Sequence, residues 1–260
     1  MKWLGMTVLL VTGGASGIGR AVIELAARRG FHVAVLDLAA AGARSSADAA
    51  EAAGAPASLG LVCNVREADE VSAAFAEVER RLGPLDALCC SAGIDRGGLA
   101  HEIGSEQWEA VLGTNLAGKF NACQSAVRSF LRDGRPGSIV CVGSPAGEVA
   151  LPRAPAYCAS KAGVAALVRS LAVDYARNGI RVNGVLPGPT NTALMWANVP
   201  APERAAIEAT IAGEVPIGRL ARPDEIASTI LFLLSDDASY TTGSLVGCDG
   251  GTLAKASLSV

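Results

Sequence analysis

Short apolar runs rich in Val, Ile and Leu alternate with longer Ala-rich stretches from one end of the chain to the other. Seven of these runs are almost continuously apolar, which is typical of strands buried on both faces of a parallel sheet. The predicted strands are Met6–Thr12, Phe31–Asp37, Ser58–Val65, Leu85–Cys90, Ser138–Val142, Ile180–Leu186 and Ser244–Cys248.

Between the predicted strands, apolar residues recur at helical spacing near residues 17–29, 40–53, 67–82, 105–132, 156–177 and 223–235. Stretches of this length supply the crossovers that parallel strands require. The pattern therefore predicts an α/β fold, a doubly wound (Rossmann) parallel sheet of seven strands with helices on both faces. No internal repeat or linker-like change of composition interrupts it, which favours a single domain over residues 1–260.

Ligands of such sheets bind beyond the carboxyl ends of the strands. Glycines 13, 17 and 19 follow the first predicted strand and open a helix, where a pyrophosphate can approach the backbone and the helix N-terminus. Asp37 ends the second strand, at about the 20-residue spacing where a carboxylate accepts the ribose hydroxyls of NAD. Neither Ser16 nor Leu38 supplies a cation for a 2′-phosphate, which favours NAD over NADP. An ordinary glycine turn and a solvated or helix-capping Asp37 remain the alternatives.

Tyr157 and Lys161 are four residues apart in a segment of helical period, so they share one helix face. An ammonium beside a phenol stabilises the phenolate and lowers the phenol's pKa, which makes Tyr157 a candidate general base. The alternative is a packing pair on an amphipathic helix.

Several motifs in one order strengthen the chemical interpretation. They are Thr12-Gly13-x-x-x-Gly17-x-Gly19, Ser91-Ala92-Gly93, Asn115, Ser144, Tyr157-x-x-x-Lys161, Pro187-Gly188 with Thr192, and Thr242-Gly243 followed by Asp249-Gly250-Gly251. In these residues, from Val8 to Gly251, the chain resembles the short-chain dehydrogenase/reductase (SDR) family.

The resemblance implies an NAD(P)-dependent oxidoreductase of alcohols and ketones. Tyr157 would be the acid and base, Lys161 would bind the nicotinamide ribose, Ser144 would orient the substrate oxygen, and Asn115 would hold a water in a proton relay. Taken alone, Ser144 is also a turn residue before Pro145, and Asn115 also suits a backbone contact inside a helix. The expected cofactor-binding set is Gly13, Ser16, Gly17, Ile18, Gly19, Asp37, Leu38, Asn64, Val65, Ser91, Ala92, Gly93, Tyr157, Lys161, Pro187, Gly188, Thr190 and Thr192.

Two positions depart from the family's usual pattern. Cys90-Ser91 stands where the family has Asn-Asn, and Asn64 stands where it has Asp. Asn64 still offers an amide to an adenine ring. Ser91 cannot make all the hydrogen bonds of an Asn, which leaves open how this strand end is held, and Cys90 is expected to be a buried inert thiol rather than a reactive one.

Substrate contacts are expected from Asp95–Leu99, Pro145–Arg153 and the insert after the sixth strand. The insert, about residues 190–216, is apolar enough to form a lid over a carbon skeleton, and equally to pack on the body or on a neighbouring subunit.

Composition narrows the class further. With 22 basic and 25 acidic residues the net charge is −3, which argues against nucleic-acid or anionic-membrane partners. The N-terminal apolar run is too short for a signal peptide or membrane span. Seven cysteines without a C-x-x-C pair indicate reduced thiols in the cytoplasm, and with only two histidines no metal site is expected.

The expected activity is NAD-dependent interconversion of a secondary alcohol and a ketone. One alternative is an NADPH-dependent carbonyl or 3-oxoacyl-thioester reductase, and another, of a different class, is a non-catalytic NAD-binding sensor or scaffold. The resemblance also implies a homotetramer or homodimer built on the helices at 105–132 and 156–177.

Overall fold

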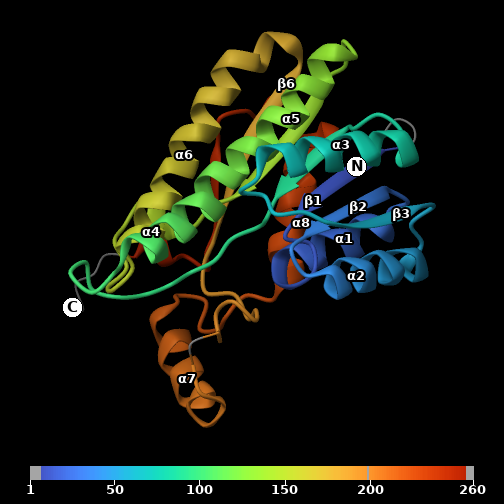
Figure 1. Ribbon diagram of the computed structural model, residues 1–260. Helices are drawn as coiled ribbons and strands as arrows, with labels where there is room; N and C mark the ends of the chain where they lie inside the picture. The colour runs from blue at the N-terminus through green and yellow to red at the C-terminus, as the bar shows by residue number, and fades with distance from the viewer. Residues whose placement is uncertain (1–6, 198, 256–260) are drawn as a thin grey trace.

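The computed structural model describes residues 7–197 and 199–255, and a single sheet of seven parallel strands runs through them (Figure 1). The spatial order is β3-β2-β1-β4-β5-β6-β7, so the strand order reverses between β1 and β4. The strands are β1 Val8–Thr12, β2 His32–Asp37, β3 Ser58–Val62, β4 Ala87–Cys90, β5 Gly137–Val142, β6 Ile180–Pro187 and β7 Leu245–Cys248. The predicted doubly wound fold is confirmed, and ligands of such folds bind at this reversal. Met6, the first residue of one predicted strand, lies outside the described residues.

Helices cover both faces of the sheet (Figure 1). One apolar core lies under α1, α2 and α8, and a second lies under α3, α5 and α6. Small residues, mostly Ala, let these helices approach the strands closely. The helices are α1 Gly17–Ala27, α2 Ala40–Ala53, α3 Ala68–Leu82, α4 Ser105–Leu112, α5 Gly118–Arg132, α6 Pro155–Tyr175, α7 Arg204–Glu214 and α8 Pro223–Leu234.

Several element ends differ by one or two residues from the sequence-based prediction, and three differences are larger. The third strand ends at Val62 rather than Val65, because the chain turns away there and the backbone N–H of Asn64 donates to the Glu70 carboxylate at 2.8 Å. The single helix predicted over 105–132 is divided by a π-helical turn, Gly113–Ala117. Such turns widen the helix and are frequent at functional sites.

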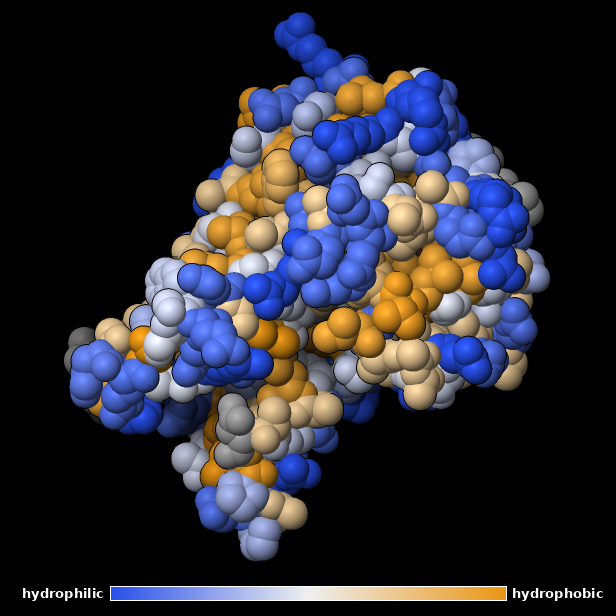
Figure 2. All heavy atoms as spheres, in the orientation of Figure 1, coloured by the Kyte–Doolittle hydropathy of each residue, from blue (hydrophilic) through white to orange (hydrophobic). Residues whose placement is uncertain are grey.

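The third difference is α7, a helix within the insert that the sequence analysis left unassigned. It projects from the body in Figure 1, and none of its residues is buried. Apolar side chains gather on the surface where the insert joins the body (Figure 2). The apolar residues of α7 follow a helical period only weakly, because the helix does not pack on a core.

The helix α6, with the short turn that follows it (Pro155–Asn178), is long and apolar enough to cross a membrane by length and composition. It is the one such helix in the described part of the chain. In the fold it packs against β6 and α4 and contains Tyr157 and Lys161. Core helices of this kind have the same composition as membrane spans.

Candidate active site

The turn after β1 is shaped by glycines at two points of close backbone approach. Gly13 has φ +70°, and a Cβ there would lie 2.6 Å from the Ala92 Cα atom. A Cβ on Gly19 would lie 2.3 Å from the carbonyl oxygen of Gly13. The turn therefore presents only backbone to the crevice between β1 and β4, as close binding of a pyrophosphate requires.

The helix α1 begins at Gly17, directly beneath this turn. Its N-cap residue Ser16 is exposed and makes no side-chain cap hydrogen bond. The N–H groups of the first turn, including that of Ile18, are left to an external acceptor such as a phosphate oxygen. The Ile18 side chain packs onto the core and fixes the helix start.

Asp37 lies at the end of β2, next to the glycine turn. Its carboxylate accepts the backbone N–H of Ala15 at 3.0 Å and that of Ala39 at 3.0 Å. Each carboxylate oxygen keeps acceptor capacity for a ribose hydroxyl. Leu38 beside it is 69% exposed, as expected of a residue that would cover an adenosine.

Asn64 follows on the loop after β3, and the N–H of the preceding Cys63 donates to the carbonyl of Asp37 at 2.9 Å. The Asn64 amide oxygen accepts the N–H of Arg66 at 3.2 Å, so its NH₂ group is the part suited to an adenine acceptor. The Val65 side chain instead lies in the core beside Gly118 of α5, so it is not directed at a ligand.

Asn115 lies in the π-helical turn, and its side chain binds the loop that follows β4. The fully buried Asn115 side chain accepts the N–H of Ile94 at 2.8 Å and donates to the carbonyl of Ile94 at 2.9 Å. It also donates to the hydroxyl of Ser160 on α6 at 3.1 Å. The backbone contact that was the alternative for Asn115 is therefore present. One lone pair of the Asn115 amide oxygen is still available to accept a hydrogen bond. The role of Asn115 in a water relay stays a prediction.

Tyr157, Ser144 and Lys161 converge at the carboxyl ends of β4 and β5. Ser144 follows β5, and its hydroxyl accepts the N–H of Ala146 at 3.1 Å and is hydrogen-bonded to the Tyr157 side chain. The Lys161 ammonium lies 5.3 Å from the centre of the Tyr157 ring and donates to the carbonyl of Val142 at 3.1 Å. The arrangement brings a hydroxyl donor, a phenol and an ammonium to one point.

The electrostatics of this group differ from the simple expectation. Burial raises the pKa of Tyr157, and the hydrogen bond to Ser144 opposes this only in part. Burial, together with the nearby Lys119 ammonium, holds the pKa of Lys161 well below its usual range. A buried phenol ionises readily only beside additional positive charge. Among the described residues, the surroundings of Tyr157 therefore raise its pKa rather than lower it.

The end of β6 closes the crevice from the other side. The Gly188 backbone contacts Asp249, so closely that a Cβ would lie 2.7 Å from the Asp249 Cα atom. The Thr190 hydroxyl donates to the carbonyl of Gly188 at 2.8 Å, and Thr192 lies against Gly17. Pro187, Gly188, Thr190 and Thr192 thus lie along one path that leads back to the glycine turn.

The chain was compared with known proteins. Residues 13–252 match the family model described as "Enoyl-(Acyl carrier protein) reductase". A 2-(S)-hydroxypropyl-CoM dehydrogenase of Xanthobacter autotrophicus is 36% identical over 95% of this chain and 96% of its own. The 3-oxoacyl-(acyl-carrier-protein) reductase of Thermotoga maritima is 38% identical over 94% and 96%. A short-chain type dehydrogenase/reductase from Mycobacterium marinum superposes with a TM-score of 0.90 at 31% identity, covering 97% of both chains.

The chain belongs to the short-chain dehydrogenase/reductase family. It is an oxidoreductase of the NAD(P)-dependent type, as the resemblance implied, with relatives named as dehydrogenases and as a reductase.

The backbone at the unusual Cys90-Ser91 pair is held by Lys119, a residue of α5. Lys119 is fully buried, and its ammonium donates to the carbonyl of Cys90 at 2.9 Å and to that of Ala92 at 2.8 Å. Ser91 itself is held through its backbone N–H, which donates to the carbonyl of Thr12 at 3.1 Å. The end of β4 is therefore held by a lysine rather than by an asparagine side chain at position 90 or 91.

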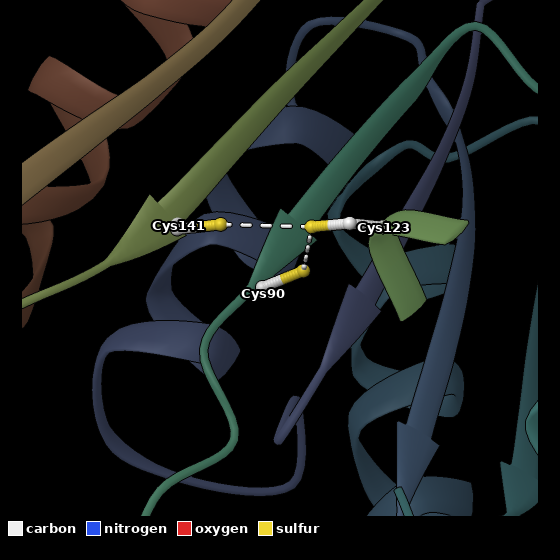
Figure 3. A group of neighbouring side chains, drawn as sticks. All are labelled: Cys90, Cys123 and Cys141. Carbon is white, nitrogen blue, oxygen red and sulfur yellow. Dashed lines mark hydrogen bonds between the residues drawn. The ribbon is translucent and has the colours of Figure 1, made fainter. Parts of the chain in front are cut away.

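Cys90 also packs against two other thiols (Figure 3). Its sulfur lies 3.8 Å from that of Cys123 on α5, which lies 3.7 Å from that of Cys141 on β5. Hydrogen bonding to Cys123 and burial hold the pKa of Cys90 well above its usual range, which keeps it protonated and unreactive. These three cysteines are the one group of three potential metal ligands among the described residues, and no histidine or carboxylate joins them. The expectation of no metal mechanism stays a prediction.

Sequence reasoning missed Lys119 and Ser160, which position the site from α5 and α6. Both lie one helical turn from a predicted site residue, Lys119 after Asn115 and Ser160 after Tyr157. The available signal was a lysine on the same helix face as the apolar residues Ala122, Cys123 and Ala126, because a charge is buried only where it is hydrogen-bonded.

We expect Gly13→Ala to weaken NADH binding by at least about 10-fold, because a Cβ would press on the Ala92 backbone in the crevice. Gly30→Ala is the matched control: Gly30 has φ +79°, yet nothing lies within 4 Å of its Cβ position. Both variants carry the same kind of backbone strain. Titration of NADH fluorescence compares them, and equal affinities would refute the crevice as the binding site.

Proposed function

We propose that this SDR enzyme interconverts a secondary alcohol and a ketone with NAD as cofactor. The observation that carries the proposal is the convergence of Ser144, Tyr157 and Lys161 at the carboxyl edge of the sheet, beside a turn that only glycines permit. A proton carrier and a cofactor crevice thus meet at one place.

In this proposal Tyr157 takes the proton of the substrate hydroxyl during oxidation and returns it during reduction. The Ser144 hydroxyl, fixed by the N–H of Ala146, donates to the substrate oxygen. Lys161 holds a ribose hydroxyl and stabilises the phenolate through its ammonium. A bound nicotinamide supplies the hydride acceptor or donor, and its positive charge in the oxidised form favours ionisation of Tyr157.

The preference for NAD rests on Asp37. A carboxylate at the ribose position accepts both hydroxyls and repels a 2′-phosphate. No basic side chain is adjacent to it in the sequence, since its neighbours are Leu36 and Leu38. The second candidate function, carbonyl or 3-oxoacyl-thioester reduction with NADPH, would require the opposite cofactor preference. The name of the Thermotoga maritima relative supports the reductase activity of this candidate.

The same residues would act in both directions, so assays with both cofactors decide between the two candidates. A non-catalytic NAD-binding scaffold is disfavoured, because Ser144, Tyr157 and Lys161 are all present and grouped. It would be supported by NADH binding without turnover across a broad panel of alcohols and ketones.

The insert at 190–216 is proposed as a substrate lid of the single domain. It leaves the body at Thr190 and Thr192, next to the glycine turn, and its projecting helix α7 has no buried residue. A projecting segment that joins the body beside the crevice, and whose helix has no buried residue, is suited to open and close over it.

We also propose a homotetramer or homodimer with its interface on α4, α5 and α6. An apolar hollow of about 500 Å³ lies there, lined by Trp108, Glu109, Leu112, Gly113, Leu116, Ala117, Phe120 and Leu167. Phe120 is 44% exposed and Trp108 is 40% exposed. Apolar hollows of this kind on a protein surface indicate a protein interface.

All seven cysteines are free thiols in the structure. We place the protein in the cytoplasm, where thiols stay reduced.

For the chemistry, we expect Tyr157→Phe to lower kcat by about 10³-fold, since the proton acceptor is lost. Its affinity for NADH should remain within about twofold, because the ring still fills its place. Tyr240→Phe, at a fully exposed tyrosine, is the control and should be neutral. Steady-state assays with a secondary alcohol measure both; a Tyr157→Phe enzyme of unchanged kcat would show that another group carries the proton.

For the cofactor, Asp37→Asn should reduce the ratio of kcat/KM for NAD over NADP by about 10-fold or more, because the repulsion of a 2′-phosphate is removed. Asp48→Asn removes the same charge from an exposed position on α2 and should leave the ratio unchanged. A wild-type enzyme that prefers NADP would contradict the role given to Asp37.

For the assembly, Phe120→Glu should shift the protein to a smaller species in light scattering, because a carboxylate would be buried at the interface. Ala76→Glu places the same side chain on the exposed face of α3 and should not change the mass. Identical masses for wild type and Phe120→Glu would exclude this face as an interface.

A further inference from the structure

Asp95 is held rigidly at the edge of the candidate site. The preceding residue, Ile94, has both its N–H and its carbonyl bonded to the Asn115 side chain. Three residues further on, the N–H of Gly98 donates to the carbonyl of Arg153 at 2.7 Å. Asp95 is thus fixed between two anchored points, on the loop that connects β4 to α4 and is hydrogen-bonded to the segment before α6.

One oxygen of the Asp95 carboxylate is buried and unsatisfied. Its Oδ1 atom is shielded from solvent and has no hydrogen-bond partner among the described residues. The carboxyl group receives a hydrogen bond from the backbone of Arg96. An unpaired buried acceptor costs about 1–3 kcal/mol, so such groups are usually completed by a ligand or by water.

Two basic side chains of the segments after β5, one before α6 and one on α6, are paired with other carboxylates. The Arg153 guanidinium lies 3.4 Å from the Glu102 carboxylate, and Arg169 lies 3.6 Å from Glu148. No ion pair with Asp95 is formed within residues 7–197 and 199–255. The free oxygen is therefore not part of a structural salt bridge.

The carboxylate is close enough to the reacting groups to affect both of them. Its charge raises the pKa of Tyr157 and, in opposition to burial, that of Lys161. Burial in turn raises the pKa of Asp95 itself. Asp95 lies on the loop after β4 and Ser144 directly follows β5, and because these strands are neighbours in the sheet the two residues lie at the same carboxyl edge.

We propose that Asp95 is a specificity-determining residue that accepts a hydrogen bond from a second hydroxyl of the substrate, on the carbon next to the reacting carbinol or the one beyond. The preferred substrates are then diols and polyols rather than simple secondary alcohols. Substrates with a carboxylate at that position are disfavoured by repulsion. The inference rests on the proposed function, since it assigns the substrate class of that same site.

An alternative donor is an ammonium group. It would hydrogen-bond to Asp95 as a hydroxyl does, and it would gain attraction from the negative charge. The hydroxyl is favoured because Lys161 lies 5.3 Å from the centre of the Tyr157 ring and, when charged, would repel a second cation at the site.

The test compares substrates that differ only in the second group, with the full-length enzyme and NAD. The ring series is cyclohexanol, cyclohexane-1,2-diol, cyclohexane-1,3-diol, 2-methoxycyclohexanol, 2-aminocyclohexanol and 2-hydroxycyclohexanecarboxylate. The matching short-chain series starts from butan-2-ol, butane-2,3-diol and 3-methoxybutan-2-ol. The methyl ether keeps the oxygen but cannot donate, so it isolates the hydrogen bond.

For the wild type we expect kcat/KM for the better diol to exceed that for its ether by about 10- to 100-fold, the range for hydrogen bonds to charged groups. Asp95→Ala should abolish this ratio while retaining turnover of the simple alcohol. Asp95→Asn keeps an acceptor of nearly the same shape, so it should retain part of the diol preference and lose the discrimination against the carboxylate.

Glu102→Gln removes a neighbouring charge whose carboxylate is already bonded to the Leu99 N–H, and it should leave every ratio unchanged. Equal kcat/KM for diol and ether in the wild type, or the same ratio in Asp95→Ala, overturns the inference and leaves the proposed function standing. A preference for the amino alcohol over the diol overturns the hydroxyl assignment. Absence of turnover for every member of both series contradicts the proposed function itself.

Discussion

Two buried ammonium groups at the carboxyl edge of the sheet determine how the site is built. Lys119 is held by the carbonyls of Cys90 and Ala92, and Lys161 is held by the carbonyl of Val142. Neither forms an ion pair in the described part of the chain. Burial without a counter-ion disfavours the charged form of an amine, and it holds the pKa of Lys161 well below its usual range. Negative charge bound at this edge would favour the charged form again.

The fold delivers these cations to one place because parallel strands end together. Reversal of the strand order between β1 and β4 separates the helices on the two faces and opens a crevice there. The crevice is lined by backbone on the Gly13 side and by the loop that Lys119 and Asn115 hold on the other. A phosphate, a phenolate and a carboxylate such as Asp95 are all anionic partners that this edge can stabilise. Burial and the charge of Asp95 raise the pKa of Tyr157, so positive charge bound nearby would favour its ionisation.

Much of this could be predicted from the sequence because strongly periodic features determine it. The strands are continuously apolar and the glycine turn follows the first of them, so the fold and the position of the crevice follow from pattern alone. The helix α7 could not be predicted in the same way, because it lies against no core and carries little amphipathic signal. The π-helical turn at Gly113–Ala117 was also missed, since π and α hydrogen bonding are compatible with the same residue types.

Lys119 shows the limit of pattern reasoning most clearly. The sequence revealed that Cys90-Ser91 departs from the family pattern at the β4 end, but not what replaces the missing hydrogen bonds. The replacement comes from a helix about thirty residues away, and only the packing of α5 on the sheet brings its ammonium to the two carbonyls. Cysteine at position 90 fits the same solution, because a small side chain packs against Cys123 and leaves its carbonyl to the lysine. The departure at the strand end and the buried lysine on α5 thus meet at the same backbone, where the Lys119 ammonium binds the carbonyls on either side of Ser91.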